Sequence, residues 1–213
     1  MSDNKKLIPG EYELQPSSPD DANYLFPIFL KLEQLSLLIV GGGYVGNEKL
    51  TAVLQNSPKA TIKLVSIAIS EEIKEIAKKY PNITLIERPY HADDINDHDI
   101  VIAALNDAKV SKQVSIDAKQ KGKLVNVADK PALCDFYLSS VVQKGHLKIA
   151  ISTNGKSPTV AKRLKEFLNE TLPIELNTLL DNMQNIRNKI TGDFTEKVKQ
   201  LNEITKKLVE DNK

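Results

Sequence analysis

The stretch Leu37-Leu38-Ile39-Val40-Gly41-Gly42-Gly43-Tyr44-Val45-Gly46 decides which fold this sequence predicts. Its leading apolar residues predict a buried strand, and the G-x-G-x-x-G spacing that follows predicts a tight turn into a helix. Gly41 permits the turn, Gly43 lets the backbone approach a pyrophosphate at the helix N-terminus, and Gly46 lets the helix pack closely on the strand. The stretch therefore indicates a dinucleotide site, whose predicted contacts are Gly41, Gly43, Tyr44, Val45 and Gly46. A glycine-rich turn without a nucleotide is the alternative interpretation.

Short apolar runs alternate with helical patterns on the C-terminal side of this turn. We expect strands at residues 61–66, 83–87, 100–104 and 124–127, helices between them, and a pre-sheet strand at 26–30. Strands that are apolar on both faces and alternate with helices are typical of a parallel sheet covered on two sides. The sequence therefore predicts an α/β fold with a Rossmann-type parallel sheet, whose ligands bind at the carboxyl ends of the strands.

The pattern changes after residue 129. Residues 147–152 indicate one more strand, and Ser157-Pro158 is a typical helix start because serine caps the helix and proline fits its first position. Further helical patterns follow residue 173, each with a narrow apolar stripe that needs a partner surface, either the rest of the chain or a second subunit. The polar, proline-containing N-terminus is interpreted as a flexible leader.

The overall composition excludes several classes of protein. Apolar residues make up 41% and charged residues 27%, as in ordinary globular proteins, and the net charge of +1 gives no sign of a nucleic-acid partner. A single cysteine, Cys134, excludes an internal disulfide and fits a reducing compartment. No apolar run approaches the ~20 residues that span a bilayer, and no secretory signal is visible. We therefore predict a soluble, cytoplasmic protein without a membrane partner.

Positions after two of the predicted strands bear on the cofactor. An NAD site usually has an acidic residue at the end of the second strand, but this chain has Ser66, with Ala68 two residues further on. Ser66 can bond a ribose hydroxyl, so Ser66 and Ala68 are predicted cofactor contacts, and the choice between NAD and NADP stays open. Asn106 and Asp107 follow the strand at 100–104 and would border the nicotinamide. Asp107 is equally well explained as a helix N-cap.

Asp129 follows the strand at 124–127, on the ligand side of the predicted sheet. A carboxylate there can accept a proton or steer a cationic reaction centre, and a solvated loop residue is the alternative. Residues 136–165 then contain six basic residues and no acidic one. This concentration of one sign indicates an anionic partner, with a solvated surface as the alternative. Few aromatic residues and no reading motif accompany it, so nucleic acid is not predicted.

Several segments match one known family in order: FPIFLKL, LIVGGGYVGNEK, IAALND, NVADKPALCDF and GHLKIAISTNGKSPTVAKRLKEFL. Across residues 26–173 the sequence resembles the precorrin-2 dehydrogenases of sirohaem synthesis, some of which also insert Fe²⁺. The resemblance implies NAD-dependent oxidation of the tetrapyrrole precorrin-2 to sirohydrochlorin, and the family's essential aspartate falls on Asp129. The octacarboxylate substrate suits the acid-free stretch, whose predicted substrate contacts are Ser152, Thr153, Lys156, Lys162 and Arg163.

The resemblance also implies how the chain is divided. We expect a flexible leader at 1–24, an NAD-binding Rossmann domain at 25–129, a small dimerisation and substrate segment at 130–172, and a helical C-terminal part at 173–213. A homodimer is the expected assembly. The chain departs from the family at Gly46, where alanine is common, and at Glu48, where arginine is common. It also departs at Ser139 and Lys144, where proline and arginine are frequent.

Two other features shape the prediction. Cys134 has no neighbouring base, so we interpret it as a small packed residue rather than a nucleophile. The function alternative is a non-catalytic dinucleotide-sensing Rossmann domain, which predicts an acidic end to the second strand and gives no reason for an aspartate followed by an acid-free stretch. Possible metal ligands concentrate in one loop but match no metal motif, so no metal site is predicted and Fe²⁺ insertion stays open: His91, Asp93, Asp94, Asp97, His98 and Asp99.

Overall fold

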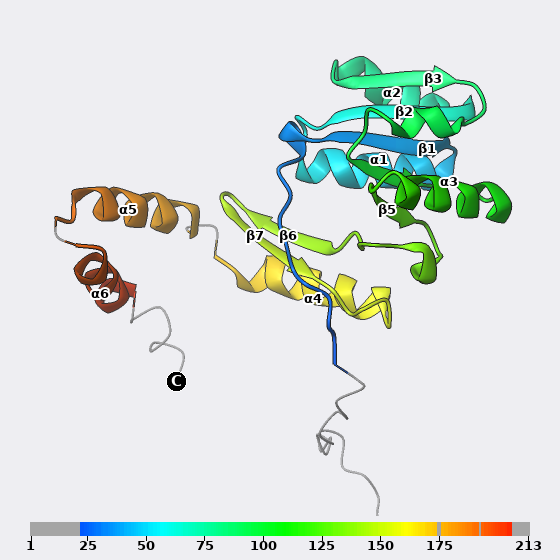
Figure 1. Ribbon diagram of the computed structural model, residues 1–213. Helices are drawn as coiled ribbons and strands as arrows, with labels where there is room; N and C mark the ends of the chain where they lie inside the picture. Colours follow the sequence, from blue (N-terminus) through cyan, green and yellow to red (C-terminus); the bar gives the residue numbers. More distant parts are fainter. Residues whose placement is uncertain (1–21, 174–175, 192, 206–213) are drawn as a thin grey trace, which may run out of the picture.

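The computed structural model describes residues 22–173, 176–191 and 193–205. Its centre is a parallel sheet of five strands in the order β3-β2-β1-β4-β5 (Figure 1). The predicted Rossmann-type sheet is confirmed, and the strand order reverses between β1 and β4. Sheets of this kind bind ligands at the carboxyl ends of the strands where the order reverses. The strands are β1 (Ser36–Gly42), β2 (Thr61–Ile69), β3 (Ile83–Glu87), β4 (Ile100–Ala103) and β5 (Leu124–Val127).

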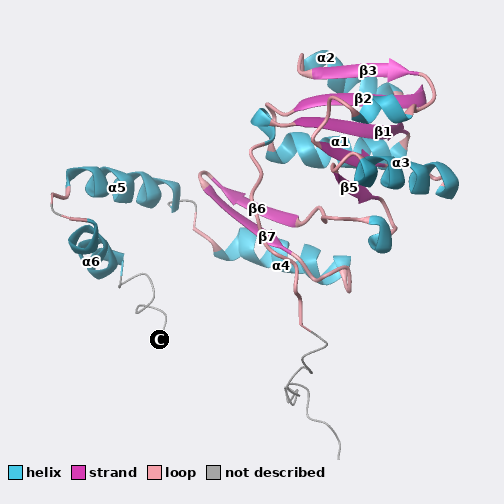
Figure 2. Cartoon of the chain, viewed as in Figure 1, coloured by secondary structure: helices cyan, strands magenta, loops and turns pink. Residues whose placement is uncertain are grey.

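Helices cover both faces of the sheet (Figure 2). Helices α1 (Tyr44–Asn56) and α2 (Glu71–Lys79) pack on one face, and α3 (Ala108–Gln120) packs on the other with the 3-10 helix η3 (Ala92–Ile95). The central strand β1 is therefore buried on both sides, and each of residues 37–40 is at most 1% exposed. This two-sided burial explains why its sequence is an unbroken apolar run rather than an alternating one.

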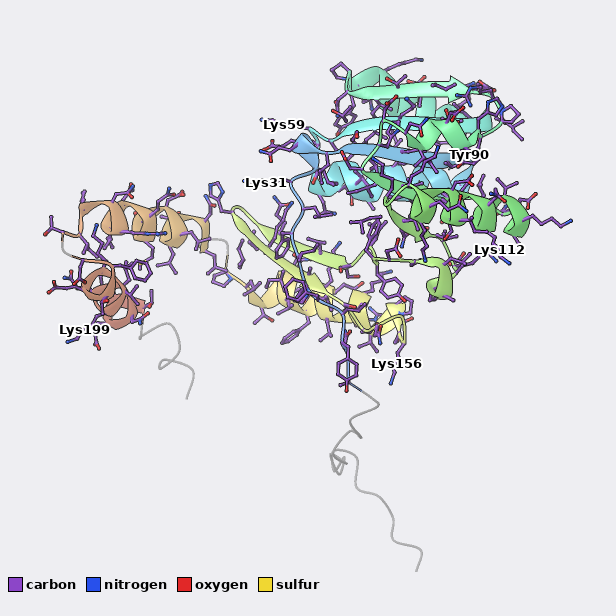
Figure 3. All side chains as sticks on the ribbon, in the orientation of Figure 1. Lys31, Lys59, Tyr90, Lys112, Lys156 and Lys199 are labelled. Atoms are coloured by element: carbon purple, nitrogen blue, oxygen red, sulfur yellow. The ribbon has the colours of Figure 1, made fainter. Side chains whose placement is uncertain are left out.

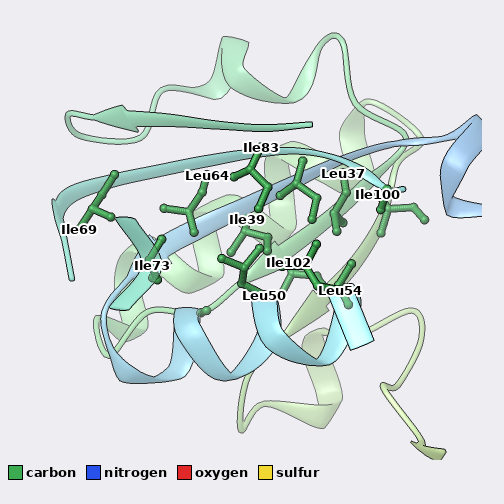
Figure 4. Packing of buried hydrophobic residues seen from close by; sticks show 14 residues of the cluster. Leu37, Ile39, Leu50, Leu54, Leu64, Ile69, Ile73, Ile83, Ile100 and Ile102 are labelled. Atoms are coloured by element: carbon green, nitrogen blue, oxygen red, sulfur yellow. The ribbon is translucent and has the colours of Figure 1, made fainter. Parts of the chain in front are cut away.

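Leucine and isoleucine side chains fill the layer between the sheet and α1 (Figure 4). Ile39 of β1 and Leu64 of β2 belong to the same buried cluster as Leu50 and Leu54 of α1. Full burial of each such side chain contributes about 1.5–3 kcal/mol. The cluster therefore fixes α1 against the strands, and with it the glycine turn that joins β1 to α1.

A smaller unit follows the sheet. Strands β6 (Ser140–Lys144) and β7 (Leu147–Ile151) form an antiparallel hairpin, and α4 (Pro158–Thr171) packs on β6. Val142 of β6 and Ala161 of α4 are both buried. Lys148 Nζ of β7 donates a hydrogen bond to the carbonyl oxygen of Asn56 (2.5 Å), which joins the hairpin to the C-terminal end of α1. Two short 3-10 helices flank the sheet in the sequence: η2 (Leu32–Gln34) precedes β1 and η4 (Pro131–Leu133) follows β5.

The helices at the C-terminus, α5 (Leu176–Lys189) and α6 (Phe194–Thr205), contact each other after α4. None of their described residues is buried. Asn177 Oδ1 of α5 accepts a hydrogen bond from the backbone nitrogen of His146 (3.0 Å), so α5 also touches the hairpin. Residues 1–21, most of the predicted leader, lie outside the described residues, and the division of the chain at 24, 129 and 172 stays a prediction.

The structure corrects the strand predicted at residues 26–30. These residues belong to no strand, and in Figure 1 the segment (blue) leads away from the sheet. Phe26, Ile28 and Phe29 are 85%, 57% and 67% exposed. Pro27 has no N–H to give to a ladder, and an apolar composition alone does not supply a neighbouring strand. The prediction was wrong because it inferred a strand from hydrophobicity without a pairing partner.

Candidate functional site

The glycine turn is built by close backbone packing. Gly41 has a φ of 119°, and a Cβ there would overlap the carbonyl oxygen of Ala104, at the end of β4. A Cβ on Gly46 would overlap the carbonyl oxygen of Gly41, so the first turn of α1 lies against the end of β1. The third glycine of the motif therefore permits helix–strand packing, as in the dinucleotide fingerprint. Gly42 is equally constrained, since its Cβ would meet Ala68 and Ser66 of β2.

Gly43 is open where the other glycines are crowded. It is the N-cap of α1, it is exposed, and a Cβ there would meet no atom within 4 Å. Having no side chain, it gives no cap to the N–H groups of the first helical turn, which are left to bind an anion with the positive end of the helix dipole. The residues present therefore fit a dinucleotide pyrophosphate at this position.

A cavity of about 280 Å³ lies at the carboxyl ends of β1, β2 and β4, and we call it the glycine-turn cavity. Six of the predicted cofactor contacts line it, and Leu105, which was not predicted, joins them. Ser66 lies at the wall formed by β2. The lining residues are Gly41, Gly42, Gly43, Tyr44, Val45, Ser66, Ala104, Leu105 and Asn106.

Three predicted cofactor residues do not line this cavity. Gly46 packs inside the turn, and Ala68 presents its carbonyl oxygen to Gly42. Asp107 is the N-cap of α3, because its Oδ1 accepts hydrogen bonds from the backbone nitrogens of Lys109 (2.8 Å) and Val110 (3.1 Å). These backbone bonds hold the pKa of Asp107 below its usual value. The structure thus gives Asp107 the capping role that the sequence left as an alternative.

Asp129 is presented by a tight turn directly after β5. The backbone nitrogen of Lys130 donates to the carbonyl oxygen of Val127 (3.2 Å) and closes the turn. Asp129 has a φ of 58° and an exposed side chain. A left-handed conformation costs most L residues about 1–2 kcal/mol, but aspartate and asparagine tolerate it better. Non-glycine residues in this region concentrate at functional sites.

The thiol of Cys134 contacts the backbone of this turn. Its Sγ accepts a hydrogen bond from the Val127 nitrogen (3.2 Å) and lies 3.3 Å and 3.4 Å from the carbonyl oxygens of Val127 and Lys130. The next residue continues the attachment, since the Asp135 nitrogen donates to the carbonyl oxygen of Val125 (2.7 Å). The segment after η4 therefore runs along β5 and braces the residues that carry Asp129.

A second cavity, of about 290 Å³, surrounds this turn, and we call it the Asp129 cavity. The hairpin and the loop before α4 supply one wall, so the structure brings the predicted substrate residues Ser152 and Thr153 to the same cavity as Asp129. The loop is held internally: Thr153 Oγ1 accepts a hydrogen bond from the Ser157 nitrogen (3.2 Å) and donates one to the Ser157 carbonyl oxygen (3.1 Å). Lys49 of α1 and Tyr137 also line the cavity, and neither was predicted as a site residue.

The three predicted basic contacts lie outside this lining. Lys156, Lys162 and Arg163 are exposed on the loop and on α4, and Figure 3 shows Lys156 at the outer side of this unit. Arg163 is paired with Glu166 one helical turn away (2.7 Å). Their contact with a substrate stays a prediction.

The two cavities lie at the ends of neighbouring strands. Ala104 after β4 lines the glycine-turn cavity, and Ala128 after β5 lines the Asp129 cavity. The strands are neighbours, and the Ala128 nitrogen donates to the carbonyl oxygen of Ala103 (2.9 Å). Ligands in the two cavities would therefore lie at the ends of neighbouring strands, β4 and β5.

The loop rich in possible metal ligands is organised by other bonds. Asp94 accepts hydrogen bonds from both terminal nitrogens of Arg88 and from the His91 nitrogen. These partners, chiefly Arg88, hold the pKa of Asp94 below its usual value. His98 is buried with its Nδ1 2.7 Å from the carbonyl oxygen of Asp94. These side chains therefore stabilise the loop before β4, away from both cavities.

Fold and site together define a class, the dinucleotide-binding α/β proteins with a second ligand cavity beside the cofactor position. The chain belongs to the family described as "Putative NAD(P)-binding", whose model matches residues 28–140. Residues 144–171 match a second family, described as "Sirohaem biosynthesis protein central". The resemblance inferred from the sequence is thereby confirmed, and so is a dinucleotide cofactor of the NAD type.

Individual relatives agree with this assignment. The chain is 34% identical over 168 residues to a siroheme synthase of Nitrosomonas europaea, covering 79% of this chain and 35% of the relative. It is 37% identical over 175 residues to a siroheme synthase of Vesicomyosocius okutanii, covering 81% of this chain and 36% of the relative. The chain thus spans about a third of the length of these curated relatives.

Among solved structures, the fold is similar to "SirC, precorrin-2 dehydrogenase", with a TM-score of 0.69 and 26% identity. The match covers 84% of this chain and 89% of that one. In the described part of the chain no helix is both long and apolar enough to cross a membrane.

Proposed function

We propose that the chain is a precorrin-2 dehydrogenase that oxidises precorrin-2 to sirohydrochlorin with NAD⁺ in sirohaem synthesis. The observation that carries the proposal is the position of Asp129, which lines a cavity of its own after β5, the strand next to β4 whose end lines the glycine-turn cavity. Family membership supports the cofactor. The siroheme synthases and SirC support the substrate, because the similarity extends through the hairpin and α4 that wall the Asp129 cavity.

The reaction removes two electrons and two hydrogens from the macrocycle. NAD⁺ supplies the hydride acceptor when bound at the glycine turn. Asp129 takes the proton that leaves the neighbouring carbon or nitrogen, which a carboxylate positioned at the end of β5 can do. Two features support this role: Asp129 lies in a left-handed turn, and the Ala128–Ala103 hydrogen bond joins the residue before it to the end of β4. The proposed proton acceptor and the hydrogen bond beside it therefore lie at the ends of two adjacent strands, β4 and β5.

The substrate side of the proposal rests on charge and hydroxyl groups. Precorrin-2 carries acidic side chains around its ring, and the Asp129 cavity offers the Ser152 and Thr153 hydroxyls on one wall. Residues 136–165 contain no acidic residue that would repel such a ligand. Lys156, Lys162 and Arg163 would contact carboxylates that project beyond the cavity, in keeping with their exposed positions.

A homodimer is part of the proposal. Val160, Leu164 and Phe167 recur on one face of α4 and are 49%, 44% and 59% exposed. Apolar side chains at this spacing normally face a partner. The exposed apolar segment that includes Phe26 and Phe29 adds to the surface that a second copy would cover. A cytoplasmic location is proposed with it, on the free thiol of Cys134 and the biosynthetic role of the relatives.

One spectroscopic assay tests the function. Purified protein is mixed with precorrin-2 and either NAD⁺ or NADP⁺, with and without Fe²⁺, and the absorption spectrum is followed over time. Formation of sirohydrochlorin with NAD⁺ is the expected result, and the Fe²⁺ arm decides whether metal insertion belongs to the activity. Binding of NAD⁺ without any oxidation would instead favour a non-catalytic dinucleotide sensor. Light scattering at micromolar concentration tests the dimer.

A further inference from the structure

We propose that Lys49 of α1 binds a carboxylate of the substrate inside the Asp129 cavity, an inference that rests on the proposed function. The sequence places Lys49 on the cofactor helix, far from the acid-free stretch, and gives it no role in substrate binding. The structure brings it to the cavity because the hairpin and α4 fold back towards the α1 side of the sheet.

The charge inside the cavity points to Lys49. Of all the residues that line it, three are charged: Lys49, Asp129 and Lys130. Asp129 is the proposed proton acceptor, and a polyanionic substrate must lie beside it. The two lysines offset this negative charge, and without them the cavity would repel its ligand. Lys130 belongs to the turn itself, so Lys49 is the lining cation that comes from another element, α1.

Lys49 is also better enclosed than the predicted basic contacts. Its side chain is 20% exposed, whereas that of Arg163 is 78% exposed. A charge–charge contact in a partly closed site is screened less by water and salt than one on an open surface, and it contributes more to binding. The lysine within the cavity should therefore outweigh the exposed cations of α4 in substrate affinity.

The ion pair of Lys49 in the free protein is weak enough to be exchanged. Lys49 Nζ lies 2.9 Å from Glu48 Oε1, and the Glu48 side chain is 56% exposed. Consecutive helical residues do not face each other, so Lys49 must fold sideways to make this contact. Because the Glu48 carboxylate is exposed to water, the pair contributes little, about 0–1 kcal/mol. A substrate carboxylate can therefore replace Glu48, and Glu48 competes with substrate for the lysine.

The experiment compares Lys49→Met with Lys59→Met as a matched control. Lys59 is an exposed lysine between α1 and β2, at the amino edge of the sheet, and Figure 3 shows it far from Lys156. The probe is uroporphyrin III, a stable octacarboxylate that is not oxidised in the assay, and its fluorescence anisotropy gives the Kd. NAD⁺ affinity, the melting temperature, and kcat and KM for precorrin-2 are measured on the same proteins.

Lys49→Met should raise the Kd for uroporphyrin III and the KM for precorrin-2 about ten-fold, since a charged hydrogen bond is lost. The kcat, the NAD⁺ affinity and the melting temperature should stay near wild type. Lys49→Arg should restore most of the affinity, Glu48→Gln should lower the Kd about two-fold, and Lys59→Met should change nothing.

The experiment distinguishes a failure of the inference about Lys49 from a failure of the proposed function. If the wild-type protein oxidises precorrin-2 and Lys49→Met binds both ligands as tightly as wild type, the inference about Lys49 is overturned and the proposed function stands. If wild type neither turns over precorrin-2 nor binds uroporphyrin III, both fail together. If Lys49→Met does not fold, Lys49→Gln takes its place, with the same outcomes required.

Discussion

Cys134 Sγ and the backbone nitrogen of Val127 lie 3.2 Å apart, in hydrogen-bond contact, directly beneath the turn that carries Asp129. The sulfur also lies within 3.4 Å of the carbonyl oxygen of Lys130 on the far side of that turn. One side chain thus touches the backbone before and after Asp129. The position of the proposed proton acceptor depends on this contact as well as on β5.

Replacing Cys134 should therefore affect turnover through the turn. Cys134→Ala removes the acceptor of the Val127 N–H and should cost about 1–3 kcal/mol of unfolding free energy and lower kcat, because a buried donor loses its partner. Cys134→Ser keeps a donor and an acceptor and should retain more of both. Urea denaturation and steady-state kinetics check this. Equal kcat in the alanine and serine proteins would contradict the positioning role.

Two substitutions of Asp129 separate the role of its carboxylate in catalysis from the role of the residue in backbone conformation. Asp129→Asn keeps a residue type that tolerates a positive φ, so its stability should match wild type while turnover falls at least 100-fold, the usual effect of losing a general base. Asp129→Ala should lose the same activity and an additional amount of stability, about 1 kcal/mol. Thermal denaturation and the spectroscopic assay give the two quantities. Near-normal turnover by Asp129→Asn would remove the carboxylate from proton transfer.

Two glycines of the motif should respond to alanine in opposite ways. Gly46→Ala places a methyl group on the carbonyl oxygen of Gly41, so the fold should lose several kcal/mol of stability. Gly43→Ala meets no protein atom and should leave stability unchanged, yet the methyl group would stand in the path of the pyrophosphate and weaken NAD⁺ binding about ten-fold or more. Calorimetry of unfolding and of NAD⁺ binding tests both. Unimpaired NAD⁺ binding by Gly43→Ala would argue against a pyrophosphate at this turn.

Stability should fall in acid in two steps. Burial, with Lys63 nearby, lowers the pKa of His98 from its usual 6.5, so the folded state holds the neutral ring while the unfolded chain takes up a proton first. The stability that His98 contributes is therefore present above about pH 6.5 and is lost as the pH falls through the lowered pKa. Arg88 lowers the pKa of Asp94, and that contribution is lost below its usual value of 3.8.

Urea denaturation of wild type and His98→Gln between pH 7.5 and 5 tests the first step. The loss of unfolding free energy over this range should be smaller in His98→Gln, because the variant has no buried ring to protonate. Asp107→Asn is the control, because Asp107 does not contribute to the pKa shift of His98 and its effect should be constant above pH 5. Parallel pH curves for wild type and His98→Gln would contradict the assignment.

Most of the sheet could be predicted because its strands are buried on both faces. The apolar runs at residues 83–87 and 124–127 coincide with β3 and β5, and Ser157 caps α4 as expected. Strand β6 was missed, because Val142 is its one buried residue and the surrounding pattern gives no clear period. The sequence feature that could have indicated β6 is Gly145, which lies in the hairpin turn with a φ of 57°.

The site residues likewise divide into those that the sequence could predict and those that it could not. The residues of the glycine turn and Asp129 follow strands in the sequence, so topology alone places them at one edge of the sheet. Lys49 could not be found this way, because its role depends on where the hairpin packs after residue 139. For Lys162 and Arg163 the sequence shows the charge, but the side of α4 on which they lie depends on the packing of the buried residues Val142 and Ala161.

The Asp129 cavity takes its walls from the sheet on one side and from the hairpin with α4 on the other. A macrocycle held there would bridge two parts of the chain that bonds such as that from Lys148 to Asn56 also join. A macrocycle bound in the Asp129 cavity should therefore reduce the motion of both parts. Backbone amide hydrogen exchange should slow in the hairpin as well as around the strand ends.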